Sequence, residues 1–379
     1  LDPAYELEVA KGYLPFITLD QLNQLAQQFI TEENRILLVS SPKREDLQIP
    51  SEQAFLDIIK KVEEMDIQAY EEEVSDEPIV DTNTIVPGKI LEEKQGAYES
   101  LVWTLSNGIK VVVKPTTHKK DEVLFSLQNN GGLSIIPEAL LPSVESTVFS
   151  FWTQNNGVGN FSATSLKRKL TGKIASAVPF IRSYSQGITG SASPQDIQTL
   201  LELVYAHIVT PRFVDSEYEA SIAQLKAIIP NIEKTPDFIF QKEVYNTLFN
   251  NNVRSQLISS ELIQKASLAD LEKAYRLCFV NNNGAVVTIV GNVDPETLKP
   301  LVELYLGSLP SATQPAVWVK DDNRIRKGSV ENHFKVVMET PKTSVANIYS
   351  ADMDYNLKNE IYFDAVQSIL NMTYVQTLR

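Results

Sequence analysis

The residues of this chain that could bind a metal ion are few and widely spaced. There is one cysteine, Cys278, and there are three histidines, His118, His207 and His333, which are 89 and 126 residues apart. Zinc peptidases of the H-E-x-x-H and inverted H-x-x-E-H types place two imidazoles one helical turn apart, so that both bind one ion. Neither motif occurs here. We therefore predict that this chain binds no zinc.

Each of these residues has an ordinary structural explanation. His118 lies in the polar turn T-T-H-K-K and is expected to be exposed. His207 lies near the C-terminal end of a predicted helix, where the helix dipole favours a histidine. His333 begins a predicted strand. Cys278 lies on the apolar side of a helix, which predicts a buried, inert thiol, and a single cysteine excludes an internal disulfide framework or a four-cysteine zinc site.

Other catalytic motifs are incomplete. Gly157-Val158-Gly159 resembles a phosphate-binding loop, but Ser162 stands where G-x-G-x-x-G needs its third glycine. The chain has no G-x-x-x-x-G-K-[ST] and no G-x-S-x-G. No pair of carboxylates can be singled out from the many acidic residues.

Composition is that of a globular protein with an acidic first quarter. The 379 residues are 43% hydrophobic, and no run of about 18 apolar residues predicts a membrane span. Residues 1–100 hold 22 Asp and Glu against 8 Lys and Arg, whereas the rest of the chain holds 26 of each. The acidic run within 45–81 is typical of a solvated helix end leading into a linker. No basic patch with interleaved aromatic residues is present, so we expect no nucleic-acid binding.

The hydrophobic pattern predicts an α+β fold with antiparallel or mixed sheets packed against helices. Ser106-Asn107-Gly108 predicts a tight hairpin turn, and Ser193 with Pro194 predicts a helix start. The predicted helices are 17–30, 51–65, 138–152, 162–170, 194–209, 214–229, 236–249, 267–279 and 294–306. The predicted strands are 35–40, 102–105, 109–113, 123–129, 188–191 and 285–290.

One helix–turn–strand element occurs twice. Residues 17–41 match 266–291, with Leu19 aligned to Leu268, Leu22 to Leu271 and Phe29 to Phe279. The spacing of 249 to 250 residues is too long for a solenoid repeat. It indicates duplicated modules of domain size or larger, although two such common units could also match by chance.

A second repeat concerns the opening of a module. Residues 335–354 resemble 110–130: Lys-Val-Val begins both, and Ile348-Tyr349-Ser350 aligns with Leu124-Phe125-Ser126. The chain is therefore expected to be a fragment of a duplicated, multi-module protein. The expected domains are the C-terminal tail of a preceding module (1–73), an acidic linker (74–97), a complete module (98–315) and the truncated start of a final domain (316–379).

Several motifs in this order resemble one known family, the pitrilysin/insulysin-type zinc peptidases. The resemblance covers residues 17–50 and 100–379 and rests on their order and spacing, since no single motif is diagnostic. The motifs are W-T-L-S-N-G-I-K-V-V-V-K-P-T (103–116), D-E-V-L-F-S-L (121–127), Gly131-Gly132, the run 157–173, G-I-T-G-S (187–191) and V-V-T-I-V-G-N-V-D (286–294).

The resemblance implies two related halves of two α+β domains each, which clamp around a chamber. One half carries H-x-x-E-H on the helix after the Gly-Gly strand. The corresponding region here, 131–149, has Glu138 and Glu145 but no histidine, so the module resembles the non-catalytic half. The resemblance thus implies zinc in the parent protein and none in this chain. It also implies a catalytic half in the same polypeptide or a partner subunit, peptide substrates, and a bacterial periplasm rather than a cytoplasm.

One residue is a candidate for substrate binding. In the family, a helix of the final module ends in Leu-Arg, with a tyrosine seven residues later, and the Arg and Tyr hydrogen-bond the bound peptide. Leu378-Arg379 matches the first part, and the tyrosine position lies past residue 379. Arg379 could equally be an ordinary arginine on a helix surface.

Two other functions remain open at this point. The parent could be a catalytically dead structural or binding subunit of the same fold, or the chain could be an unrelated peptide-binding or scaffold domain. An H-x-x-E-H motif elsewhere in the parent would favour the peptidase.

Overall fold

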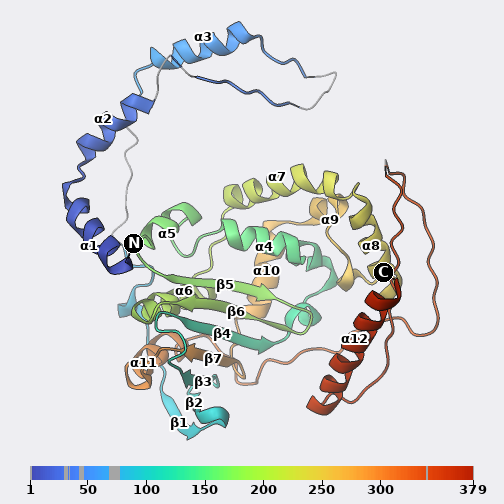
Figure 1. The fold of residues 1–379 in the computed structure, drawn as a ribbon. Helices are drawn as coiled ribbons and strands as arrows, with labels where there is room; N and C mark the ends of the chain where they lie inside the picture. Colours follow the sequence, from blue (N-terminus) through green and yellow to red (C-terminus); the bar gives the residue numbers. More distant parts are fainter. Residues whose placement is uncertain are drawn as a thin grey trace. The chain divides into compact units, whose positions relative to one another are not determined.

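A computed structural model describes residues 2–29, 33, 35–41, 47–67, 77–338 and 340–378 (Figure 1). The chain divides into two compact units, Leu1–Glu72 and Glu73–Arg379. None of the described helices combines the length and the hydrophobicity that a membrane span requires.

The first unit consists of helices whose apolar side chains are exposed. It contains α1 (Pro3–Tyr13), α2 (Leu19–Phe29) and α3 (Glu52–Glu63), which confirms the helices predicted at 17–30 and 51–65. The strand predicted at 35–40 was wrong: Ile36 and Leu38 are 92% and 88% exposed, and the segment is irregular. A strand forms only against a neighbour that accepts its hydrogen bonds, and no described residue pairs with this segment.

The second unit is built on one seven-stranded sheet, which confirms the α+β fold with a mixed sheet. The strand order is β1-β2-β3-β7-β4-β6-β5. Only β3 and β7 are parallel, and the other neighbours are antiparallel. The strands are β1 (Ile90–Gln95), β2 (Leu101–Leu105), β3 (Lys110–Pro115), β4 (Val123–Asn130), β5 (Ala175–Ile181), β6 (Ser185–Ala192) and β7 (Val286–Gly291).

Two strands and two helix interruptions differ from the predicted pattern. β1 forms within the segment expected to be linker, and β5, which contains Pro179, was missed because Ala, Ser and Pro give a weak strand signal. The helix predicted at 138–152 is a 3₁₀ segment, η5 (Glu138–Val144), followed by α4 (Ser146–Asn155). The helix predicted at 294–306 is α11 (Pro295–Leu301) and a π-type turn (Val302–Leu306). Prolines at 142 and 300 lie in these regions and weaken regular helical hydrogen bonding.

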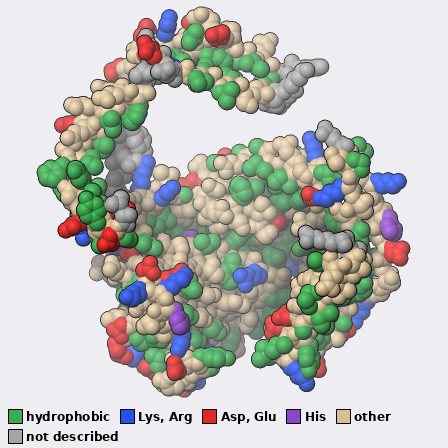
Figure 2. Space-filling model, in the orientation of Figure 1, with side chains coloured by type: hydrophobic (Ala, Val, Ile, Leu, Met, Phe, Trp, Pro, Cys, Tyr) green, Lys and Arg blue, Asp and Glu red, His purple; other side chains and the backbone are tan. Residues whose placement is uncertain are grey.

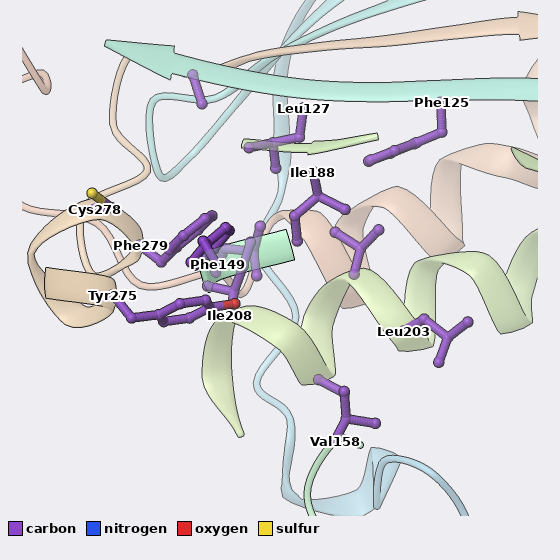
Figure 3. Packing of buried hydrophobic residues seen from close by; sticks show 14 of the residues in the cluster. Phe125, Leu127, Phe149, Val158, Ile188, Leu203, Ile208, Tyr275, Cys278 and Phe279 are labelled. Atoms are coloured by element: carbon purple, nitrogen blue, oxygen red, sulfur yellow. The ribbon is translucent and has the colours of Figure 1, made fainter. Parts of the chain in front are cut away.

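Helices cover one face of the sheet. α4, α6 and α10 contact strands β5 and β6, and Figure 3 shows side chains of α6 and α10 packed beneath β4. Alternate residues of β4 point into this core: Val123, Phe125 and Leu127 are buried, whereas Leu124 is 50% exposed on the open face. The remaining helices are α5 (Ala163–Lys169), α6 (Ile197–Val209), α7 (Asp215–Ile232), α8 (Pro236–Leu248), α9 (Ser260–Lys265) and α10 (Leu268–Phe279).

The last part of the chain forms one long helix and no strand among its described residues. α12 spans Leu357–Leu378. The strand expected to begin at His333 and the strand pattern expected within 335–354 were wrong, because these residues are irregular and mostly exposed. Side chains anchor the segment to α8: Lys342 Nζ lies 2.6 Å from Asp237 Oδ1, and Asn332 Nδ2 lies 2.9 Å from Thr247 Oγ1.

Gln186, on β6, joins three parts of the core. Its Nε2 donates to the carbonyls of Asn130 and Cys278, both at 2.9 Å, and its Oε1 accepts a hydrogen bond from the amide of Gly132. The side chain is buried. It therefore links the end of β4, the following loop and α10.

Replacing Gln186 by Leu should destabilise the second unit by about 2–4 kcal/mol, because it removes the partner of the buried amide of Gly132 and of the buried carbonyl of Cys278. Urea unfolding of the chain would measure this. Gln128→Leu is the matched control, since Gln128 is exposed on the open face of β4, and should change stability by less than about 0.5 kcal/mol. Equal unfolding midpoints for the two variants would contradict this account of Gln186.

Candidate functional site

The candidate site is the loop and helix that follow β4, because the resemblance places the zinc-binding helix of a catalytic module there. The chain leaves β4 through Gly131 and Gly132, whose φ angles are +134° and +61°. A Cβ at Gly132 would lie 2.1 Å from the carbonyl oxygen of Arg182. Only glycine fits this turn, which directs the chain back beneath the sheet.

Arg254 fixes the loop from a distant part of the chain. Its guanidinium donates hydrogen bonds to the carbonyls of Leu133 and Ile136, the latter at 3.1 Å, and its Nε lies 4.0 Å from Asp321 Oδ2. Asp321 also accepts a hydrogen bond of 2.8 Å from the hydroxyl of Tyr184. The sequence analysis missed this role, since nothing local to Arg254 indicates a partner more than 100 residues away.

Glu145 caps α4. Its Oε2 accepts hydrogen bonds from the amides of Thr147 (2.8 Å) and Val148 (3.2 Å), and its Oε1 accepts one from the hydroxyl of Ser146 (2.9 Å). The carboxylate thus satisfies amides that a helix leaves free in its first turn. The sequence analysis missed this role, because the helix it predicts at 138–152 has Glu145 in its middle, whereas α4 begins at Ser146. Glu138, the other acid of the region, is exposed at the start of η5.

Aromatic side chains fill the space beneath α4. Trp152 stacks on Phe213 with ring centroids 5.5 Å apart and meets Tyr275 edge-on at 5.5 Å. Phe149 lies 6.2 Å from Tyr275, which stacks on Phe279 at 4.3 Å. Figure 3 shows Phe149, Tyr275 and Phe279 gathered between α10 and the sheet. The inward face of α4 therefore packs against the core and presents no metal ligand.

The structure does not bring the three histidines together. His118 is exposed in the loop between β3 and β4, His207 lies near the end of α6, and His333 is exposed with its Nε2 3.6 Å from Glu331 Oε2. Within the described residues, no group of three His, Cys, Asp or Glu side chains could hold a metal ion. The part of the chain that the structure describes thus offers no set of ligands that fits a zinc ion.

Burial keeps two potential ligands neutral. It lowers the pKa of His207 to about 4, although the imidazole hydrogen-bonds the backbone of Ala177. The desolvation of the charged form therefore outweighs this hydrogen bond. Burial also raises the pKa of the Cys278 thiol to about 12, so Cys278 is buried and protonated as predicted (Figure 3).

Arg379, the predicted substrate-binding residue, lies outside the described residues. Its helical context is described, since α12 extends to Leu378. A substrate contact by Arg379 stays a prediction.

Comparison with known proteins agrees with the resemblance seen in the sequence. Residues 265–379 match the family model described as the Peptidase M16 inactive domain. The chain is therefore similar to the M16, or pitrilysin, peptidase family. The match to the inactive-domain model and to the M16 relatives supports the resemblance to the non-catalytic half.

The M16 relatives are much longer than this chain. The "Zinc protease PQQL-like" of Arabidopsis thaliana is 26% identical over 322 residues, which are 83% of this chain and 30% of the relative. The "Probable zinc protease PqqL" of Haemophilus influenzae is 23% identical, over 96% of this chain and 38% of the relative. The chain therefore spans about a third of the length of these relatives.

Two solved structures share the fold. The periplasmic protease PqqL from Escherichia coli has a TM-score of 0.56 at 22% sequence identity. The match covers 71% of this chain and 30% of the PqqL chain. The ferredoxin protease FusC, solved in complex with Arabidopsis ferredoxin, has a TM-score of 0.53 at 20% sequence identity. The match covers 84% of this chain and 35% of the FusC chain.

The pKa of His207 makes the second unit less stable in acid. Between pH 6.5 and about 4 the unfolded chain binds a proton at this residue that the folded chain does not, so stability falls as pH falls. The total loss should be about 2 kcal/mol, because partial solvent access reduces the penalty of full burial. Urea unfolding from pH 7 to 4 should show a shallower decline for His207→Gln than for the parent. Parallel curves would exclude His207 as the source.

Proposed function

We propose that the protein to which this chain belongs is a zinc endopeptidase of the M16 type that degrades unfolded or short peptides in a closed chamber. In this proposal the module at 98–315 forms part of the non-catalytic wall. The observation that carries it is the state of α4: the helix that would hold zinc in a catalytic module is capped by Glu145 and packed by aromatic residues.

The catalytic half belongs to the same polypeptide or to a partner subunit in this proposal. A zinc ion held there would polarise a water molecule for attack on the peptide carbonyl. The relatives' names as zinc proteases support this. The contribution of this chain would be to enclose the peptide and exclude water. The periplasmic protease from Escherichia coli supports a periplasmic location.

The full-length protein tests the proposal directly. It should contain about one zinc per chain and hydrolyse an unfolded peptide in a chelator-sensitive way, whereas residues 1–379 alone should do neither. A full-length protein with neither zinc nor activity would favour a catalytically dead binding subunit. Chelator-sensitive hydrolysis by the purified 379-residue chain would refute a non-catalytic role for it.

We also propose that Arg379 binds the substrate peptide through its guanidinium. Arg379→Ala in the full-length protein should lower kcat/KM by about tenfold or more, because a hydrogen bond from a charged donor is lost, and zinc content should not change. Lys358→Ala is the matched control, since Lys358 is an exposed cation on α12. Equal kcat/KM for both variants would assign Arg379 to the helix surface.

A further inference from the structure

We infer that residues 318–324 form a latch that couples the loop after β4 to the chain that follows the module. We call residues 318–324 the strap, and the loop comprises residues 131–136. The strap detaches as one unit while the core of the module stays folded, and Asp321 holds it in place. The inference rests on contacts within residues 131–324 and does not depend on the proposed peptidase activity.

The strap is attached to the module without regular secondary structure and with little apolar burial. Trp318 is 50% exposed, and Val319, Lys320 and Asp322 are exposed as well. Such a segment gains little free energy from the burial of apolar surface. Its specific polar contacts therefore decide whether it stays attached, and it can open while the core remains intact.

Asp321 is the centre of these polar contacts. On the face of the molecule in Figure 2, acidic and basic side chains are scattered over the surface. The side chains of Asp321 and Arg254, by contrast, are only 10% and 12% exposed. Oδ1 of Asp321 accepts hydrogen bonds from the hydroxyl of Tyr184 (2.8 Å) and the amide of Asn323 (3.2 Å). Oδ2 lies 4.0 Å from Arg254 Nε. Removing the carboxylate would leave the guanidinium without its counter-charge in a poorly solvated place, which is costly.

Two connections join the strap to the loop after β4. The amide of Val319 donates a hydrogen bond of 3.0 Å to Ser134 Oγ, and this hydroxyl donates one of 2.6 Å to the carbonyl of Gly131. The guanidinium of Arg254, which faces Asp321, donates to two carbonyls of the same loop. The free energy of the loop therefore depends on whether the strap is attached, and this coupling is reciprocal.

Tyr184, in the turn between β5 and β6, makes the strap a single unit. Its ring meets Trp318 edge-on, with ring centroids 5.5 Å apart. Its hydroxyl donates to Asp321 and accepts a hydrogen bond of 2.6 Å from Arg324 Nη1. One side chain thus contacts the first, the middle and the last residue of the strap. Because these contacts share Tyr184, the loss of one weakens the others.

Release of the strap changes two parts of the molecule together. The chain after the strap is no longer held beside Ser255, whose Oγ donates a hydrogen bond of 2.7 Å to Asn323 Oδ1. At the same time the loop after β4 loses the contact between Ser134 and Val319. A ligand or a neighbouring domain that binds one part more tightly in one state would therefore shift the other part.

Tryptophan fluorescence of the 379-residue chain measures release. Trp103 and Trp152 are 0% and 4% exposed, so quenching by acrylamide reports mainly on Trp318, the third tryptophan. Asp321→Ala should increase the quenching constant by up to about twofold, because a half-exposed ring becomes accessible when the strap opens. Asp322→Ala is the matched control. This neighbouring acid is exposed and loses only an exposed hydrogen bond with Asn252, so quenching should not change.

Amide hydrogen exchange distinguishes a latch from a set of independent contacts. Ser134→Ala removes the acceptor of the Val319 amide and leaves the acceptor of the Asn323 amide in place. If the strap opens as one unit, exchange should become faster at both amides, by about tenfold. Amides of β4 and β7 should keep their rates, because the core stays folded.

Three results would overturn the inference. The first is equal quenching in Asp321→Ala and Asp322→Ala. The second is faster exchange at Val319 alone in Ser134→Ala, because the contacts of the strap would then be independent of one another. The third is an equal rise of exchange in β4 and in the strap in Asp321→Ala, because the strap would then unfold with the core rather than as a separate unit.

Discussion

The insertion of β7 between β3 and β4 is the constraint on which the rest of this fold depends. β7 lies about 160 residues after β4 in the sequence and pairs with both neighbours along most of its length. Without it, β3 pairs only with β2 and β4 pairs only with β6. The helices between β4 and β7 would then have no continuous sheet to cover. Such a non-local strand makes folding slow and sensitive to the intervening chain. It also joins α10, the aromatic cluster and the loop after β4 into one core.

Local sequence patterns were sufficient to predict most strands of the module. They were insufficient for the strands whose formation depends on pairing with a distant neighbour. The Asn107-Gly108 turn and the alternation of β4 predicted their strands correctly, because both patterns are set by nearby residues. Ile36 to Val39 has an equally good strand composition and forms none, since a strand needs a neighbour. β5 is the converse case: its own residues are poor strand formers, and pairing with β6 holds it in the sheet.

The features of the candidate site likewise divide into those that the sequence predicts and those that depend on distant residues. The absence of two histidines one turn apart could be read from the sequence, and it correctly separated this module from a catalytic one. The capping role of Glu145 was missed, because the predicted helix at 138–152 did not end before residue 145 and begin again after it. The hydrogen bonds of Arg254 with the carbonyls of Leu133 and Ile136 could not be predicted, because they join residues 121 and 118 positions apart. The aromatic packing of α4 against α10 has the same non-local origin.

The packing beneath α4 shows why a metal ion does not fit below this helix. The Gly131-Gly132 turn and the helix after it are present, so the backbone framework exists. However, the space below the helix holds Trp152, Tyr275 and Phe279, and the buried hydroxyl of Tyr275 donates to the carbonyl of His207 at 2.8 Å. A metal site there would require replacing close-packed rings with charged ligands in a desolvated core. Restoring zinc binding would therefore take several coordinated changes in the core, and adding two histidines to α4 would destabilise the module without creating a site.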